Sequence, residues 1–297
     1  MYPAPFHYRR AESVDDAVGL LTELGPEARP LAGGQSLLVL MKMRFSEPTA
    51  LVDLGFIPGL DYIEHDDKTV RIGALATHGD IAASAVARSI PIVGDCANGI
   101  ADTQVRSRGT IGGSLGSGDP SCDWPTLLHT LDAEIICHGP DGERRLPING
   151  FVADLYETVL GASELVTGVE FAVPAANSGG SYTAFKRCAP AYPTASVGVQ
   201  LTLDGDTCQD VRVALGSAGL TPIHATAAEA ELRGNTLTEA VINKVADAAV
   251  AASDPIEDQR GSADFKKAIL HTLTKRAIDI AARRCRGETI EASHEYY

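Results

Sequence analysis

Two Gly-Gly pairs, each flanked by hydroxyl side chains, constrain this sequence more than any other feature. The first lies in PLAGGQSLLVLMKMR, residues 30–44, where a short extended stretch leads into a helical pattern. The second lies in RSRGTIGGSLGSGDPSCDW, residues 106–124. Glycine lets neighbouring N–H groups converge on an anion, and a helix that begins after such a loop adds free N–H groups and the positive end of its dipole. Two such loops suit a diphosphate, which has two anionic centres, although a single pair is more often a tight turn.

No familiar single-loop motif accounts for these glycines. The nearest match to G-x-x-x-x-G-K-[ST] runs from Gly113 to Gly118, but Asp119 follows it, and its carboxylate would repel phosphate where that motif has lysine. The sequence contains no G-x-G-x-x-G, so the usual dinucleotide-binding signal is missing. The spacing by itself leaves an anionic cofactor and two structural turns equally open.

The composition limits the class of protein and its partners. The chain has 297 residues, enough for two domains, and 44% hydrophobic and 22% charged residues are typical of a globular protein. Its net charge of −14 argues against DNA or RNA, whose phosphates would be repelled. The apolar run LLVLM is too short to cross a bilayer, and the first ten residues lack a signal-peptide core. We therefore expect a cytoplasmic protein without a transmembrane segment.

The spacing of cysteine and histidine residues does not indicate a metal site. Six cysteines are scattered without a C-x-x-C pair, and eight histidines form no H-x-H or H-E-x-x-H pattern. We expect the cysteines to be buried thiols and the chain to bind no metal.

Periodicity and capping signals predict an α+β first domain. ESVDDAVGLLTELG, residues 12–25, is an amphipathic helix with Ser13 as its N-cap and Gly25 at its end. The second glycine pair is expected in a loop between two helices. The other expected elements are strands at 28–32, 49–55, 69–77 and 164–174, helices at 35–44, 78–87, 91–101 and 123–131, and a hairpin at 133–148.

A change of pattern near residue 176 predicts a second, smaller domain. AANSGGS, residues 175–181, has the composition of a linker. Beyond it, YTAFKRCA, TASVGVQLTLDG and CQDVRVALGSAG have the pattern of strands, and helices are expected at about 224–233, 238–252 and 262–285. The expected domains are therefore residues 1–176 and residues 177–297.

The residues around both glycine pairs resemble a known family. LAGGQSLLVLMKMR, VRIGALATHGDIA and IADTQVRSRGTIGGSLGSGDPSCDWP are similar to the FAD-binding medium subunits of the molybdenum hydroxylases, a family that includes carbon monoxide dehydrogenase and xanthine dehydrogenase. YTAFKRCAPAYPTASVGV and DQRGSADFKKAILHTLTKRAI extend the resemblance over nearly the whole chain and are most like the carbon monoxide dehydrogenase branch. The resemblance implies a two-lobed, vanillyl-alcohol-oxidase-like (PCMH-type) FAD-binding domain, divided near residues 55–60, and a C-terminal domain of an antiparallel sheet with helices.

By position, the resemblance also assigns cofactor-binding residues and no catalytic residue. One side of the diphosphate would be lined by Leu31, Ala32, Gly33, Gly34, Gln35, Ser36 and Leu37, and the other by Thr110, Ile111, Gly112, Gly113 and Ser114. Ile100 and Ala101 would pack near the cofactor, Ser117 and Asp123 would bond its sugar and nucleotide side, and Val166, Lys186 and Tyr192 would lie near the isoalloxazine ring. Without the resemblance, Asp123 is more typical of a helix N-cap, Lys186 of a solvated strand position and Tyr192 of a core tyrosine.

The resemblance implies an electron-transfer subunit of a larger assembly. Substrate would be oxidised at molybdopterin on a large partner subunit, and electrons would arrive through two [2Fe–2S] clusters on a small partner subunit. FAD on this chain would pass them to a quinone, NAD or another acceptor. The expected assembly is a dimer of heterotrimers. In such an assembly the substrate binds on another chain, so this sequence specifies neither the substrate nor the acceptor.

Two other functions fit the same residues. A stand-alone FAD-dependent oxidase or dehydrogenase would share the first domain, although His7 and Cys188 lie in no flavin-linking motif. A non-catalytic assembly module that has lost FAD would share the fold without the cofactor. If the glycines face a diphosphate, replacing Gly33 or Gly112 with valine is expected to release FAD and leave the protein folded.

Overall fold

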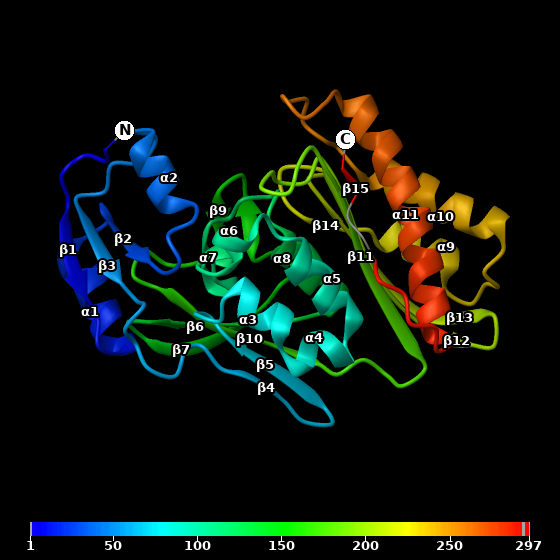
Figure 1. The fold of residues 1–297 in the computed structure, drawn as a ribbon, viewed down its shortest axis with the longest axis horizontal. Coiled ribbons are helices and arrows are strands. Elements are labelled where there is room, and N and C mark those ends of the chain that lie inside the picture. The colour runs from blue at the N-terminus through cyan, green and yellow to red at the C-terminus, as the bar shows by residue number, and fades with distance from the viewer. Residues whose placement is uncertain (1, 293–294, 297) are drawn as a thin grey trace.

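The structure, a computed structural model, describes residues 2–292 and 295–296. It has three parts in chain order, a small N-terminal lobe, a central lobe and a C-terminal domain, and each part is built on its own sheet (Figure 1). A separate cluster of buried apolar side chains fills each part. The α+β class, with two lobes and a second domain, is as the sequence predicts.

The N-terminal lobe is a parallel sheet of three strands with two helices. Its elements are β1 (His7–Arg10), α1 (Val14–Leu24), β2 (Ala28–Leu31), α2 (Leu37–Lys42) and β3 (Ala50–Asp53), and the strand order is β1-β3-β2. Helix α1 begins where the Ser13 side chain accepts a hydrogen bond from the N–H of Asp16, at 3.0 Å, and it ends at Gly25, which has φ 78°. Both capping predictions are confirmed. The first glycine pair joins β2 to α2, as expected.

The central lobe is an antiparallel sheet with helices packed on it. The sheet order is β4 (Ile63–His65), β5 (Thr69–Gly73), β10 (Leu165–Ala172), β6 (Glu134–Gly139) and β7 (Gly142–Pro147). The helices are α3 (His78–Ala83), α4 (Ala85–Ser89), α5 (Pro91–Gly99), α6 (Thr103–Arg106), α7 (Ile111–Gly116) and α8 (Asp123–Thr130). A two-stranded hairpin of β8 (Val152–Asp154) and β9 (Glu157–Thr158) follows β7 in the chain. The predicted hairpin at 133–148 is confirmed as β6 and β7.

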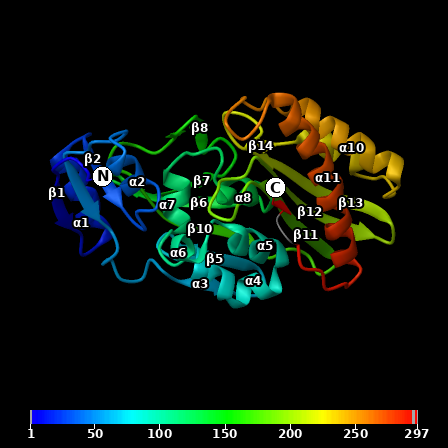
Figure 2. The same cartoon turned by 45° about the horizontal axis from the view of Figure 1, so that its top comes forward.

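The C-terminal domain places a sheet between two layers of helices. Its elements are β11 (Ser178–Lys186), β12 (Ala195–Asp204), β13 (Thr207–Gly216), β14 (Ile223–His224), α9 (Thr226–Leu232), α10 (Glu239–Ala252), α11 (Ala263–Cys285) and β15 (Glu295–Tyr296). Helix α11 covers one face of the sheet, while α5 and α8 of the central lobe lie against the other, as both views show (Figures 1 and 2). Because both faces of the sheet are covered, β11 and β12 are buried at nearly every position rather than at alternate ones, and their buried residues include small and hydroxyl side chains.

Several predicted boundaries are wrong, each for a local reason. The helix expected at 78–87 is two helices, because Ser84 is extended and its hydroxyl caps α4 by accepting from the N–H of Ala87. The helix expected at 91–101 ends at Gly99, and the strand expected at 69–77 ends at Gly73. The glycine pair expected in a loop at 112–113 lies inside helix α7.

The proposed linker at 175–181 is mostly strand, because β11 begins at Ser178. Its glycines serve close packing rather than flexibility. A Cβ atom on Gly179 would lie 2.2 Å from the carbonyl oxygen of Ala281 in α11. The strand and the helix can approach this closely only without a side chain at residue 179.

The cysteines depart in part from the expected burial. Cys96, Cys122, Cys137 and Cys208 are buried, as expected, but Cys285 is half-buried and Cys188 is exposed. Within the described residues, no helix is long and apolar enough to span a membrane.

Candidate functional site

The first glycine loop presents a row of unused main-chain donors. Gly34 has φ 75°, a conformation that glycine adopts without strain, and the chain then enters α2 at Leu37. Within the described part of the chain, the N–H groups of residues 33–37 donate to no other group. The Ser36 hydroxyl does not cap α2 either. Such a row of free donors before a helix suits an anion.

The second glycine pair lies in the first turn of α7, and its N–H groups are already bonded. The N–H of Ile111 donates to the carbonyl of Ala76 at 3.1 Å, and that of Gly112 donates to the carbonyl of Ala74 at 2.9 Å. The Thr110 hydroxyl accepts from Gly113 at 3.1 Å. The expectation that this loop supplies a second set of free N–H donors is therefore wrong. What it offers is the exposed surface of Gly113 and the hydroxyl of Ser114.

The two loops meet at the junction of the lobes, where Gly33 allows the contact, whereas Gly112 allows α7 to pack closely against Ala74. A Cβ atom on Gly33 would lie 2.0 Å from the carbonyl oxygen of Arg108, and one on Gly112 would lie 2.5 Å from the Cβ of Ala74. Valine at either position would push backbone segments apart. Both glycines are packing residues as well as loop residues, so their replacement by valine is expected to reduce the stability of the fold in addition to FAD binding.

Gly113 is different, because it faces the gap between the loops. A Cβ atom there would lie 3.0 Å from the Thr110 hydroxyl and 3.8 Å from the Cβ of Ala32. Ala32 belongs to the first loop, so this comparison places the two predicted walls opposite one another. A small side chain at residue 113 would narrow the gap without meeting backbone.

A buried ion pair joins the central lobe to the C-terminal domain. Lys186, at the end of β11, is fully buried, with its Nζ atom 3.5 Å from the Asp123 carboxylate. The Tyr182 hydroxyl donates to the same carboxylate at 2.9 Å. Lys186 also donates to the carbonyl of Gly99 at 2.6 Å, which places a cation at the C-terminal end of α5. Lys186 is thus not a solvated strand charge, and Asp123 is not an N-cap but the first residue of α8.

The other predicted residues lie around this junction. Ile100 and Ala101 form the turn after α5, directly beyond the Gly99 carbonyl that Lys186 holds. Val166 is buried in β10, the strand on which α7 packs. The Ser117 hydroxyl donates to the carbonyl of Ser114 at 2.7 Å.

Tyr192 lies where all three parts of the chain come close together. Its side chain lies near Ser36 in the first loop and near Asp119, which follows α7, and the nearby Cys122 and Asp119, together with burial, raise the pKa of the Tyr192 hydroxyl. The guanidinium of Arg260 lies 5.8 Å from the centre of its ring. Tyr192 keeps 38% of its surface exposed, so it is not a core tyrosine.

Sequence reasoning missed two side chains at this site. His78 is buried, and its Nδ1 accepts a hydrogen bond from the Trp124 indole at 3.0 Å. Burial lowers the pKa of His78 to about 4, so the ring is neutral at pH 7. Arg106 donates to the carbonyls of Ile100 and Ala101, at 2.9 and 2.8 Å. A lone histidine and a lone arginine carry no spacing signal, and only their contacts reveal them.

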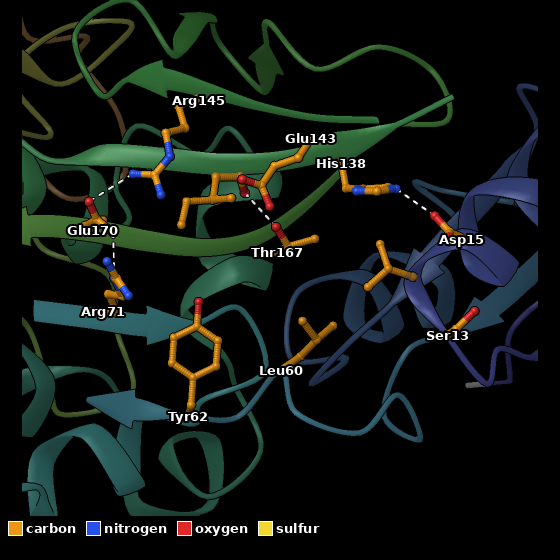
Figure 3. Close-up of a pocket in the computed structure, with 12 residues that line it drawn as sticks. Ser13, Asp15, Leu60, Tyr62, Arg71, His138, Glu143, Arg145, Thr167 and Glu170 are labelled. Carbon is orange, nitrogen blue, oxygen red and sulfur yellow. Dashed lines mark hydrogen bonds and ion pairs between the residues drawn. The ribbon is translucent and has the colours of Figure 1, made fainter. Parts of the chain in front are cut away.

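A cavity of about 530 Å³ lies elsewhere, between α1 and the exposed face of the central sheet (Figure 3). Five of its titratable side chains are paired with one another. Arg71 and Arg145 both bond Glu170, at 2.8 and 2.9 Å, and His138 bonds Asp15 at 2.7 Å. None of the predicted cofactor residues lines this cavity. It is therefore distinct from the site between the glycine loops.

Comparison with known proteins gives the same family over both domains. Residues 4–175 match the family described as the FAD binding domain in molybdopterin dehydrogenase, and residues 180–281 match the CO dehydrogenase flavoprotein C-terminal domain. The carbon monoxide dehydrogenase medium chain of Hydrogenophaga pseudoflava is 37% identical over 96% of this chain and 100% of its own length. The alpha subunit of the 6-hydroxypseudooxynicotine dehydrogenase complex of Paenarthrobacter nicotinovorans is 34% identical over 99% of this chain and 100% of its own.

A solved structure agrees with the sequence relatives. One chain of the carbon monoxide dehydrogenase of Hydrogenophaga pseudoflava superposes on this structure with a TM-score of 0.94 and 40% sequence identity. The match covers 96% of this chain and 100% of that chain. The resemblance and the fold class inferred from the sequence are thereby confirmed. Because both domains match and the relatives are covered from end to end, this chain belongs to the FAD-binding subunits of the molybdopterin dehydrogenases, the oxidoreductase family of the carbon monoxide dehydrogenase medium chains.

Proposed function

We propose that this chain is the FAD-carrying electron-transfer subunit of a molybdenum hydroxylase, most like the carbon monoxide dehydrogenase medium subunit. The observation that supports this most is the row of unused N–H groups at residues 33–37, opposite the exposed Gly113, inside a domain of an FAD-binding family. Free main-chain donors and a wall without side chains fit a diphosphate. They do so in a chain whose charge of −14 would otherwise repel one.

The proposed cofactor site follows the junction of the three parts. The first loop, residues 31–37, donates N–H groups to the diphosphate, and residues 110–114 form the opposite wall through Gly113 and the Ser114 hydroxyl. Ser117 lies toward the sugar, Val166, Lys186 and Tyr192 lie toward the ring, and Ile100 and Ala101 lie near the cofactor. Asp123, predicted on the sugar side, pairs with Lys186 at 3.5 Å and so lies on the side of Lys186. We propose the domain boundary near residue 176, which lies between the two family matches.

When bound, FAD supplies the chemistry that accepts single electrons from iron–sulfur clusters and delivers pairs of electrons to an acceptor. The chain's own residues position it and adjust the charge around it. Lys186 brings a buried positive charge, which favours a negatively charged ring, while Asp123 offsets part of that charge. Tyr192 covers the site from the C-terminal domain and limits the access of water and of acceptors.

The proposed partners are a small subunit with two [2Fe–2S] clusters and a large subunit with molybdopterin, in a dimer of heterotrimers in the cytoplasm or at the inner membrane. The names of the relatives support an assembly, since they describe a medium chain and a subunit of a complex. Helix α2 and the residues after it also leave apolar side chains exposed, which are Val39, Leu40, Met43 and Phe45. An exposed apolar patch of this kind is typical of a surface covered by another protein. The acceptor is proposed to be a quinone, NAD or another small oxidant.

These observations favour a subunit over the other two functions. A stand-alone oxidase would need a residue that takes a proton from its own substrate beside the flavin, and the resemblance assigns no catalytic residue to this chain. A module that had lost FAD would have no reason to keep five unused donors in one loop.

Purification of the chain with its partners tests the proposal directly. We expect one FAD per chain after denaturation, measured by absorbance and chromatography. Reduced iron–sulfur partner mixed with the FAD-loaded chain should bleach the flavin band in a single turnover. A chain that never carries flavin would refute cofactor binding. A flavin that substrate reduces in the absence of partners would favour the stand-alone enzyme.

A further inference from the structure

The turn between α5 and α6 has an unusual arrangement of main-chain groups. Three successive carbonyls are held by two cations. Lys186 donates to Gly99 at 2.6 Å, and Arg106 donates to Ile100 at 2.9 Å and to Ala101 at 2.8 Å. The N–H groups of Ala101 and Asp102, in contrast, donate to nothing else in the described chain.

The turn is also strained. Ala101 has φ 44°, in the left-handed region that a residue with a Cβ rarely adopts. Such a conformation persists only where the surrounding structure holds it, and it is concentrated at functional sites. Arg106 provides this restraint, because it bonds the carbonyl of Ala101 and the carbonyl of the preceding residue, Ile100.

Arg106 itself is well placed to act as a restraint. It is half-buried at the end of α6, and Asp102 fixes the start of that short helix by accepting from the N–H of Val105 at 2.9 Å. The guanidinium group is planar, and one of its nitrogens, Nη1, bonds both carbonyls. Arg106 therefore holds the turn from the short helix α6, which lies between this turn and the second glycine pair.

We propose that Arg106 is a positioning residue for FAD, which holds the strained turn at Ala101 so that its free N–H groups face an acceptor atom of the cofactor. This inference rests on the proposed function. Arg106 does not itself touch the cofactor. Arg106 bonds the carbonyls of Ile100 and Ala101, and Lys186 bonds the carbonyl of Gly99. These bonds fix the orientation of the peptide groups, so that the N–H groups of residues 101 and 102 stay free to bond the cofactor.

Arg106→Gln tests this inference, with Arg88→Gln as a matched control. Arg88 is an exposed arginine of the same lobe that also donates to a main-chain carbonyl, that of Ala83 at 2.6 Å. We expect Arg106→Gln to weaken FAD binding at least tenfold and to shift the flavin absorption band and potential, whereas Arg88→Gln changes none of these. Amide hydrogen exchange at residues 100–102 of the FAD-free protein should rise in Arg106→Gln alone.

A second substitution separates positioning from general support of the fold. Glycine adopts positive φ without strain, so Ala101→Gly in the Arg106→Gln background should recover part of the lost affinity. Arg106→Lys should also retain more affinity than Arg106→Gln. Wild-type protein that binds no FAD would refute the proposed function. Wild type that binds FAD, beside an Arg106→Gln variant with unchanged affinity, spectrum and potential, would refute the role of Arg106 alone. If Arg106→Gln loses FAD affinity and the double variant with Ala101→Gly recovers none of it, the role of Arg106 is also refuted.

Discussion

Replacing Gly113 with alanine should separate cofactor binding from folding. The new Cβ would lie 3.0 Å from the Thr110 hydroxyl and 3.8 Å from the Cβ of Ala32, with no backbone atom among its near neighbours. Alanine gains about 0.5–1 kcal/mol over glycine in a helix, and this gain offsets the small adjustment at Thr110. We expect the free energy of unfolding of the FAD-free protein to change by less than about 1 kcal/mol.

FAD binding should respond much more strongly. The added methyl group narrows the gap between the two loops and displaces the diphosphate from the first-loop donors. The loss of one hydrogen bond to a charged group costs about 1.5–3 kcal/mol, which corresponds to a roughly 10- to 100-fold larger dissociation constant for FAD. Titration of the FAD-free protein, followed by quenching of flavin fluorescence, measures this constant, and urea unfolding measures stability.

Two further glycines provide the comparison. Gly116 is exposed on the same helix, and nothing lies within 4 Å of its would-be Cβ, so Gly116→Ala should leave the dissociation constant unchanged. Gly33→Ala would meet the Arg108 carbonyl at 2.0 Å and should lose both stability and FAD. A dissociation constant of Gly113→Ala for FAD within about twofold of the wild-type value would refute the placement of the diphosphate between the loops. This limit corresponds to a change in binding free energy of about 0.4 kcal/mol.

Three other predictions test the buried groups of the site. His78 has a folded pKa of about 4, below its unfolded value of 6.5, so its stabilisation is complete above that value and is lost as the pH falls toward 4. His78→Gln should therefore remove about 2 kcal/mol of the decrease in urea stability between about pH 7.5 and pH 5, and an unchanged decrease would contradict the buried neutral ring. Lys186→Met should cost about 3–5 kcal/mol of unfolding free energy by leaving Asp123 unpaired, and adding Asp123→Asn should recover part of it, which urea unfolding of both variants checks. Tyr192→Ala should change the rate of flavin reoxidation by small acceptors more than FAD occupancy, and identical rates in stopped-flow measurements would rule out its covering role.

Local sequence signals predicted the elements whose causes are local. Ser13 and Gly25 delimit α1, and Pro140, Asp141 and Gly142 mark the turn of the β6–β7 hairpin, because capping and turn formation involve only neighbouring backbone groups. The two glycine motifs were likewise sufficient to identify the family, since their residues lie close together in the chain.

The cofactor site was predicted only as a set of positions, and its chemistry needed the fold. The sequence treats both glycine pairs alike, yet the N–H groups at residues 33–37 are free and those of Ile111 and Gly112 are bonded to Ala76 and Ala74. Whether an N–H group is available depends on which carbonyl the tertiary structure brings beside it. No local pattern contains that information.

By itself, the sequence determined the family, the α+β class, the order of most helices and strands and the positions of the two glycine motifs, because each depends on residues near one another in the chain. The tertiary structure decided that Lys186 is buried against Asp123 and that Gly179 of β11 admits α11. These are contacts between residues far apart in the chain. Burial and the choice of hydrogen-bond partner follow from how the three parts pack together.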